Sequence, residues 1–513
     1  MPYMSVSAIS DAIDHIATTY PAITQVFTLP EASVEGRSIR AFKIANGSGS
    51  NRTGVLLLGG THARELINPE TVMSFALRLC DAYTNDTGLT FGAKSYTAQS
   101  VQTVVNALDI FMLPVVNPDG RAFCMTPGNE MWRKNRAPNP GLPCRGVDIN
   151  RNYDFLWSSG IGTSTNSCTD VYKGPGAFSE PETRNVRFML DNFPNIACMV
   201  DIHSYSELVL YPWGDDQNQT TDPNQNFQNP AFDGQRGIVG SGYKEYIPPE
   251  DLEAFVALAE RIRDGIAAVR GRVYVAQEST SLYPTSGTAH DYAYARHFVD
   301  TGKRRVLGLT LETAREFQPA DAEKNNVITE VSAGLMECLQ ETLCPADVVQ
   351  DLIDAIFPLR AMRAFRDREL RRTAAGARYE KLLRAHSLEL VALAMGDRQM
   401  REAGAALMRI AASFFTDQGE MAARKIDDQD IAQVTRALTL VRRQASRRLQ
   451  TAIDTALQDA RRVRGQSLTR AFQVLSRPPP RPTRAASRKK PAAGTRAKRT
   501  TRRKAAKKTR RSK

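Results

Sequence analysis

Four stretches in the first 344 residues share one pattern, an apolar run that leads into polar residues. Their sequences are VLLLGG, LDIFMLPVVNPDG, IACMVDIHSY and RRVLGLTLE. Between them lie stretches with helix-like patterning, at residues 70–83, 179–192 and 252–270. Strands that alternate with helices are typical of an α/β fold. The pattern therefore predicts an α/β domain over residues 1–344, with a mixed, mostly parallel sheet flanked by helices.

Polar side chains suited to metal binding or proton transfer follow the four predicted strands. They are His62 and Glu65, Asn117, His203, and Glu312. In open α/β sheets, ligands bind beyond the carboxyl ends of the strands. We therefore expect the four strand ends to face one crevice.

The chain changes character at about residue 345. No proline occurs between Pro358 and Pro478, and DIAQVTRALTLVRRQASRRLQTAIDTAL repeats apolar residues at three- and four-residue steps. This spacing is typical of amphipathic helices, and Asp347, Asp427 and Asp430 are suited to helix caps or first turns. Residues 345–476 are predicted to form an all-α module, either a small bundle or an antiparallel pair of helices.

The C-terminal segment, residues 477–513, holds 17 Lys or Arg and no Asp or Glu, whereas the whole chain has a formal net charge of +13. Apart from proline and glycine, its only apolar residue type is alanine. Such a segment cannot bury enough surface to offset its ordering entropy, so we expect a disordered basic tail. The tail is expected to bind a dense polyanion such as nucleic acid, through counterion release; a solvated tail without a partner is the simpler alternative.

Length and composition fit a globular protein of more than one domain. A chain of 513 residues exceeds one ordinary core, and its 42% hydrophobic and 24% charged residues are ordinary values. No stretch approaches the ~20 apolar residues that cross a bilayer. The N-terminal residues lack a basic region and include Asp11 and Asp14, so no secretory signal is predicted and we expect a cytoplasmic protein.

Two of the six histidines end predicted strands. A single His-x-x-Glu pair such as His62 and Glu65 is more often an ordinary polar turn. Together with His203, however, the pair makes a set of two imidazoles and one carboxylate, the ligand set of catalytic zinc sites that keep a position open for water. The three residues together predict one Zn²⁺ per chain.

Six motifs in a fixed order extend this set. They are HxxE at His62, NPDG at Asn117, WRKxR at Trp132, DxNRN at Asp148, the IHSYS strand end at His203, and Tyr283 followed by Glu312. With these motifs, residues 3–344 resemble the zinc metallocarboxypeptidase family, the family of pancreatic carboxypeptidases A and B. The resemblance implies a zinc carboxypeptidase fold and hydrolysis of the C-terminal peptide bond of peptides and proteins.

The resemblance also implies roles in the chemistry. The three ligand residues bind zinc, and Asp148 orients His62. Glu312 is the general base that takes a proton from the zinc-activated water and passes it to the leaving amine. Arg133 polarises the scissile carbonyl and stabilises the oxyanion.

Further residues are implied to bind the substrate. Asn150 and Arg151 hold its terminal carboxylate, because a guanidinium matches a carboxylate bidentately. Tyr283 closes over the bound residue from a mobile loop, and Arg64 binds upstream carbonyl groups. A cationic clamp of this kind requires a free C-terminus, and the HExxH motif of many zinc endopeptidases does not occur, so an exopeptidase is predicted.

The floor of the specificity pocket departs from the family pattern. His290 falls where relatives have an aspartate for basic C-terminal residues or an apolar residue for aromatic and aliphatic ones. With no fixed anion assured, we predict that neutral C-terminal residues are preferred. Asp291, after a slip of one residue in the alignment, or Glu278, if either points inward, would reverse this preference. Glu130 stands near a position where pancreatic members have an arginine that contacts secondary subsites.

Cys144 and Cys168 fall at positions that form a disulfide in secreted relatives. A disulfide argues for an oxidising compartment, against the cytoplasmic location expected from the N-terminus. Two other functions remain open at this point. One is an amidase of the same fold that acts on cell-wall peptides. The other is a nucleic-acid-associated protein in which the hydrolase domain is secondary.

Overall fold

The computed structural model describes residues 3–47, 52–343, 362, 365–370, 372–415, 421–422 and 424–477. One compact unit spans Met1–Ser476. The predicted basic tail lies outside the described residues, except for Arg477.

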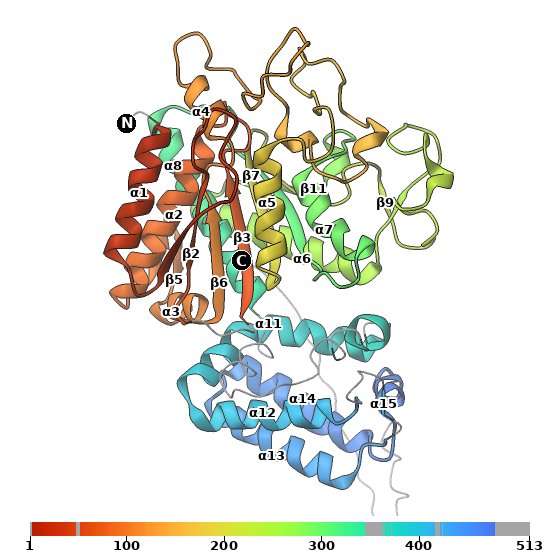
Figure 1. The fold of residues 1–513 in the computed structure, drawn as a ribbon. Helices are drawn as coiled ribbons and strands as arrows, with labels where there is room; N and C mark the ends of the chain where they lie inside the picture. The colour runs from red at the N-terminus through yellow and green to blue at the C-terminus, as the bar shows by residue number, and fades with distance from the viewer. Residues whose placement is uncertain are drawn as a thin grey trace, which may run out of the picture. The chain divides into compact units, whose positions relative to one another are not determined.

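An eight-stranded mixed sheet forms the centre of the fold, in the order β1-β2-β6-β3-β7-β12-β8-β11 (Figure 1). Its strands are β1 (Thr24–Thr28), β2 (Arg40–Ile44), β3 (Thr53–Gly59), β6 (Leu108–Leu113), β7 (Ile196–Ser204), β8 (Leu208–Tyr211), β11 (Val275–Glu278) and β12 (Leu307–Thr313). Two small sheets pair β4 (Leu89–Phe91) with β5 (Lys94–Tyr96), and β9 (Asn218–Gln219) with β10 (Glu245–Tyr246).

The four strands predicted from apolar runs are the four central strands of the sheet. β6, β3, β7 and β12 lie side by side and are all parallel. Every residue of β3 and β6 is buried, as expected of parallel strands covered on both faces. Parallel strands end at the same edge, and the register pairs Glu312 of β12 with His203 of β7. The predicted mixed, mostly parallel sheet is confirmed.

Helices cover the sheet, and all of those named next except α4 share one apolar core with it (Figure 1). They are α1 (Val6–Thr19), α2 (Ile67–Thr84), α3 (Ala98–Ala107), α4 (Pro118–Cys124), α5 (Pro181–Asn192), α6 (Pro249–Arg270), α7 (Ala289–Val299) and α8 (Asp321–Thr342). The predicted helices at residues 70–83, 179–192 and 252–270 correspond to α2, α5 and α6. α2 and α6 both pack against α8, while α7 packs on β7 and β12.

Two glycines, Gly59 and Gly60, stand at the end of β3, where the chain turns sharply at the carboxyl edge of the parallel strands. A Cβ on Gly59 would lie 2.9 Å from the carbonyl oxygen of Pro114. Gly60 has φ +64° and would place a Cβ 3.0 Å from the ring of Pro69. Side chains are excluded from both positions by the backbone angle or by close packing. The turn brings His62 directly over the end of the sheet.

The C-terminal region is helical, as predicted. Its helices are α11 (Ala374–Gly396), α12 (Arg398–Ala412), α13 (Asp428–Gln444), α14 (Arg447–Arg462) and α15 (Leu468–Leu475). Asp427 caps α13, and Asp430 accepts the reciprocal hydrogen bond from the backbone N–H of Asp427, which forms a capping box. Asp347 lies outside the described residues. Met400 and Val441 belong to a small apolar cluster of these helices, and the domain boundary at residue 344 stays a prediction.

Within the part of the chain that the structure describes, no helix is both long enough and apolar enough to span a bilayer.

Candidate metal centre and active site

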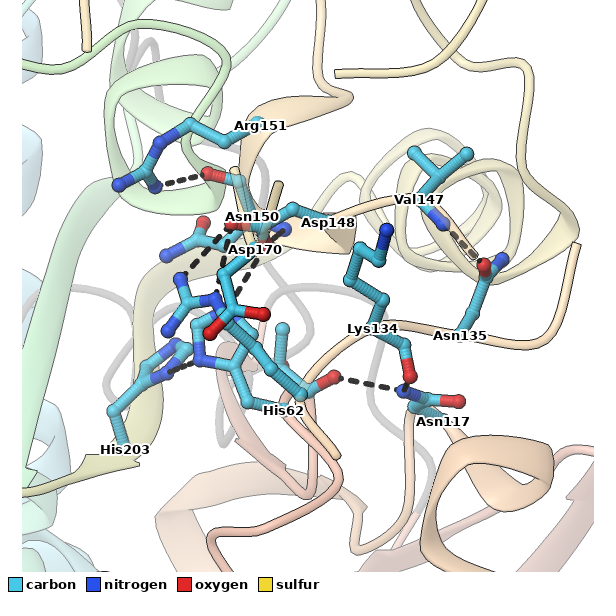
Figure 2. A network of polar contacts seen from close by, with 12 residues as sticks. His62, Asn117, Lys134, Asn135, Val147, Asp148, Asn150, Arg151, Asp170 and His203 are labelled. Carbon is cyan, nitrogen blue, oxygen red and sulfur yellow. Dashed lines mark hydrogen bonds and ion pairs between the residues drawn. The ribbon is translucent and has the colours of Figure 1, made fainter. Parts of the chain in front are cut away.

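Three predicted ligand residues, His62, Glu65 and His203, meet at the carboxyl edge of the central strands. The Nδ1 atom of His62 lies 2.7 Å from Oε1 of Glu65. The Nδ1 atom of His203 lies 3.0 Å from Nδ1 of His62 and 3.1 Å from Oε2 of Glu65. All three side chains are buried, and within the described ranges no other group of His, Cys, Asp or Glu could hold a metal ion in this way. Figure 2 shows the two imidazole rings turned toward each other.

Backbone elements hold the three residues in place. His62 and Glu65 lie in the turn between β3 and α2, and His203 is the penultimate residue of β7. The carboxylate of Glu65 also accepts hydrogen bonds from Ser204 N at 3.1 Å and from Asn68 Nδ2 at 3.4 Å. Glu65 therefore joins the turn after β3 to the end of β7.

The electrostatics of the group favour a cation. Burial opposes the charge of Glu65, but His62 and His203 outweigh it and hold the pKa of Glu65 below its usual value. Burial likewise opposes a charge on His203, but Asp201 and Glu65 raise the pKa of His203 well above its usual value. The carboxylates thus select a positive charge between the rings, and a proton or a divalent cation can supply it.

The donor set fits Zn²⁺. Two imidazoles and one carboxylate are typical ligands of a catalytic zinc ion, which binds them at about 2.0–2.2 Å. Donor atoms bound at such distances lie roughly 3–4 Å apart, and the atoms here lie slightly closer together, at 2.7–3.1 Å. The far nitrogen of each ring also faces a carboxylate, as is usual for metal-bound histidines.

His62, Glu65 and His203 are called the metal group below. Asp148 contacts His62 from the side opposite this group, as the resemblance implied. Its Oδ1 lies 3.0 Å from Nε2 of His62 and also accepts the backbone N–H of Asn150. Its Oδ2 accepts from Nε and Nη2 of Arg133, at 3.1 and 3.0 Å. Despite complete burial, Arg133 and His62 hold the pKa of Asp148 well below its usual value. Asp148 is therefore an ionised acceptor that can fix the ring of His62.

Asp201 is a second carboxylate that contacts a predicted metal ligand, and it was not predicted from the sequence. Its Oδ2 lies 2.8 Å from Nε2 of His203, and its Oδ1 accepts from the hydroxyl of Thr61 at 3.0 Å. The signal was present in the sequence, because residues two apart in a strand point to the same face. Asp201 stands two residues before His203 in β7.

Glu312 lies beside the metal group, where a base is expected. It is partly buried at the end of β12, directly across from His203. Burial raises the pKa of Glu312 to about 8, with a further increase from Glu65, while His203 and Arg133 act in the opposite direction. A cation held by the ligand residues would favour the ionised, basic form of Glu312.

The two arginines predicted near the reacting bond have different surroundings. Arg133 is largely buried, with two of its nitrogens on Asp148 and Nη1 4.0 Å from Oε1 of Glu65. Arg64 lies over the ring of Phe317 and donates to Asp170 at 3.0 Å. Of these two arginines, Arg133 contacts residues of the metal group, whereas the contacts of Arg64 are with Asp170 and Phe317.

Asn150 and Arg151, which are predicted to hold the substrate carboxylate, closely follow Asp148 in the chain. Arg151 is buried, and its Nη1 donates to the carbonyl oxygen of Asn150 while its Nε donates to that of Gly162 (Figure 2). Its guanidinium carbon lies 5.9 Å from the centre of the Tyr283 ring, which is 48% exposed. The partly exposed Tyr283 ring thus lies near the buried guanidinium of Arg151.

Asn117 of the NPDG motif has a structural role. Its Nδ2 donates to the carbonyl oxygens of Thr61 and Lys134 at 3.2 and 3.1 Å (Figure 2). The side chain therefore ties the turn that carries His62 to the segment that carries Arg133.

The predicted pocket floor contains a neutral imidazole rather than a free carboxylate. Burial lowers the pKa of His290, whose Nδ1 lies 3.0 Å from the hydroxyl of Thr310. The two oxygens of the buried Asp291 accept from Gly214 N at 3.2 Å and from the Thr288 hydroxyl at 2.7 Å. Burial also raises the pKa of Asp291. Both oxygens of this carboxyl group are therefore hydrogen-bonded within the protein, and its ionised form is disfavoured.

Two further predicted residues lie away from the metal group. Glu278 accepts from Asn218 N at 3.2 Å, and burial raises its pKa. Glu130 accepts from Gly128 N at 2.9 Å in an exposed turn. Both carboxylates thus accept a hydrogen bond from a backbone N–H group.

Cys144 and Cys168 form a disulfide, as the resemblance implied. The bond joins the two ends of the loop that follows the Arg133 segment and includes Asn150 and Arg151. The other described cysteines are free and buried.

Comparison with known proteins agrees with this geometry. The sequence profile of a family described as zinc carboxypeptidase matches residues 9–331. Carboxypeptidase A4 of Mus musculus is 31% identical over 293 residues, which cover 57% of this chain and 59% of that protein. Carboxypeptidase B of Astacus astacus is 32% identical over 317 residues, which cover 60% of this chain and 89% of that protein. The match thus spans about three-fifths of the mouse relative's length.

Solved structures show the same fold. Thrombin-activatable fibrinolysis inhibitor superposes with a TM-score of 0.53 at 20% identity, over 66% of this chain and 74% of that chain. Carboxypeptidase A from Helicoverpa armigera superposes with a TM-score of 0.52 at 23% identity, over 66% and 73%. From its sequence profile, its fold and its His-Glu-His group, this chain belongs to the zinc carboxypeptidase family.

Proposed function

We propose that this chain is a zinc-dependent metallocarboxypeptidase that removes the C-terminal residue of peptides and proteins, with one zinc ion per chain. The observation that carries the proposal is that a candidate base and a buried arginine lie close to the metal group. A candidate base, Glu312, pairs with His203 across the sheet. A buried guanidinium, Arg151, follows closely after Asp148, which contacts His62 (Figure 2). Metal, base and carboxylate clamp are the parts that hydrolysis of a C-terminal peptide bond requires.

The residues divide the chemistry among them. Zinc, when bound, supplies a Lewis acid that lowers the pKa of water. Glu312 accepts the water proton and delivers it to the leaving amine. Arg133 stabilises the negative charge that develops on the carbonyl oxygen, through the Nη1 atom that does not contact Asp148. Asn150 and Arg151 hold the terminal carboxylate, and Tyr283 covers the bound residue.

Arg151→Ala is expected to slow hydrolysis of peptides with a free C-terminus by about 10–150-fold in kcat/KM. The lost guanidinium–carboxylate hydrogen bonds are worth about 1.5–3 kcal/mol. The measurement compares kcat/KM for blocked peptides that differ only in a free or amidated C-terminus. Arg145→Ala, which changes an exposed arginine, is the control and should behave as the unmodified protein does. Equal losses on the free and amidated peptides would contradict the clamp and favour an endopeptidase or an amidase.

Neutral C-terminal residues, aromatic or aliphatic, are expected to be cleaved at least about tenfold faster than Lys or Arg. An ammonium or guanidinium in the pocket would lack a free carboxylate, and an unpaired buried charge costs about 1–3 kcal/mol or more. A panel of blocked dipeptides that vary only in the last residue, with and without a zinc chelator, measures this preference. Faster cleavage of Lys or Arg would show that Asp291 or Glu278 serves the pocket after all.

The alternative functions have less support. A cell-wall amidase that accepts a D-residue or diaminopimelate would need altered clamp residues, whereas Asn150 and Arg151 are both present. Binding of nucleic acid by residues 477–513 stays a prediction, because residues 478–513 lie outside the described part of the chain. The Cys144–Cys168 disulfide supports an oxidising compartment over the cytoplasm expected from the N-terminus.

A further inference from the structure

Asp201 is a buried carboxylate that contacts the metal-binding residue His203 and has no role in the function proposed above. It is 0% exposed, and its two oxygens face different partners. Oδ1 accepts from the Thr61 hydroxyl at 3.0 Å, and Oδ2 lies 2.8 Å from Nε2 of His203. The ring nitrogen and this oxygen are in close contact but are not aligned as an ideal hydrogen bond.

The arrangement repeats, on the second histidine, what Asp148 does for the first. Nε2 of His62 faces Oδ1 of Asp148 at 3.0 Å, and Nε2 of His203 faces Asp201. In both rings the Nδ1 atom is the one that points to Glu65. A carboxylate at Nε2 favours the tautomer with its proton on Nε2 and leaves the Nδ1 lone pair for a metal.

The two carboxylates differ in their remaining partners. Asp148 shares its second oxygen with the guanidinium of Arg133, whereas the second oxygen of Asp201 meets the hydroxyl of Thr61. An isolated buried carboxylate is costly unless it is paired. His203 is the group that offers Asp201 a positive charge or a polarised N–H, so the two side chains depend on each other.

We propose that Asp201 is a positioning residue that orients His203 and selects its Nδ1 atom as the metal ligand. The proposal rests on the zinc site of the proposed function but not on peptide hydrolysis. The plain alternative is a structural role, in which Asp201 only ties the Thr61 turn to β7.

Asp201→Asn separates the two roles through zinc affinity. The ion is the probe, and a chromophoric chelator competes for it in the absence of substrate, so a failure of peptide hydrolysis does not affect the result. We expect zinc affinity to fall by about 10–100-fold, the usual cost of removing a carboxylate behind a metal-bound histidine. Asp148→Asn should give a loss of the same order. Unchanged affinity, within about twofold, would overturn the proposal.

Thermal unfolding of the zinc-loaded and chelator-treated forms provides a readout that a structural role would not reproduce. A ligand that binds only the folded state raises its stability according to its affinity. Asp201→Asn should therefore shrink the increase in Tm that zinc produces. Asp119→Asn is the matched control, because Asp119 is equally buried and contacts Ser33, Glu35 and Arg37 instead. This control should lower both Tm values alike, and the same behaviour in Asp201→Asn would establish the structural role.

Thr61→Val keeps the proposal testable if Asp201→Asn does not fold. This variant removes the hydroxyl from Oδ1 of Asp201 and leaves the carboxylate in place. In the zinc-loaded unmodified protein, imidazole N–H signals in proton NMR should show a proton on Nε2 of both zinc-binding histidines. The His203 signal should shift in Thr61→Val, and the His62 signal should not. Zinc bound through Nε2 of His203, or a His203 signal that does not respond, would overturn the proposal.

Discussion

Glu312→Gln is expected to abolish peptide hydrolysis while the protein stays folded and keeps its zinc. An amide cannot accept the proton of the attacking water, and it cannot return that proton to the leaving amine. General-base catalysis contributes about 10²–10⁴-fold to rates, and we expect kcat to fall by at least this factor. The side chain is not a metal ligand, so zinc content should remain near one ion per chain.

The measurement is kcat/KM on a blocked dipeptide, together with metal analysis and thermal unfolding. Glu316→Gln, an exposed glutamate four residues farther along the chain, is the matched control and should leave kcat/KM unchanged. A Glu312→Gln variant that hydrolyses peptides at near-normal rates would remove Glu312 from the mechanism. Loss of zinc from this variant would instead make Glu312 part of the metal site.

His203→Ala is expected to release zinc and to lose activity with it. Only His62 and Glu65 would remain, and two protein ligands hold zinc poorly compared with the usual three. The alanine would also leave Asp201 buried without the group that faces its Oδ2, which costs about 1–3 kcal/mol or more of stability. Residual hydrolysis should not exceed that of the chelator-treated unmodified protein.

Zinc content per chain, measured after gel filtration, checks this expectation. His15→Ala changes an exposed histidine in α1 and should retain both metal and activity. One tightly bound zinc per chain in His203→Ala would falsify the ligand assignment. Full zinc loading with activity lost would place His203 among the catalytic groups instead.

Local sequence patterns predicted the central part of the fold. Apolar runs of strand length and the helical spacing between them indicated the four parallel strands and the helices α2, α5 and α6. Chemistry-bearing residues at the ends of those runs indicated the site, because parallel strands end at one edge of a sheet. The outer strands β1, β2, β8 and β11 went unpredicted. β1, β2 and β11 are short and partly exposed, which weakens the apolar pattern, whereas β8 is buried but only four residues long.

Residue types and spacing were enough to propose His62, Glu65 and His203 as metal ligands, whereas the role of Glu312 as a base came only from the resemblance of motifs. A resemblance of motifs extended that set to Asp148, whose contact with His62 the structure shows. The structure brings these residues together at the carboxyl edge of the central strands, and their roles in metal binding and catalysis stay predictions.

Only the tertiary structure decided how charges are shared at the site. It showed that Gly214 and Thr288 donate hydrogen bonds to the carboxylate of Asp291. It also showed that Asp201 contacts His203. Sequence order cannot reveal such pairings, because the partners come from different strands and loops and meet through the packing of the sheet. Burial then strengthens each interaction, since the low dielectric of the interior makes an unpaired charge costly and a paired one specific. The sequence therefore determined which groups are present, and the fold determined which of them remain available for a metal or a substrate.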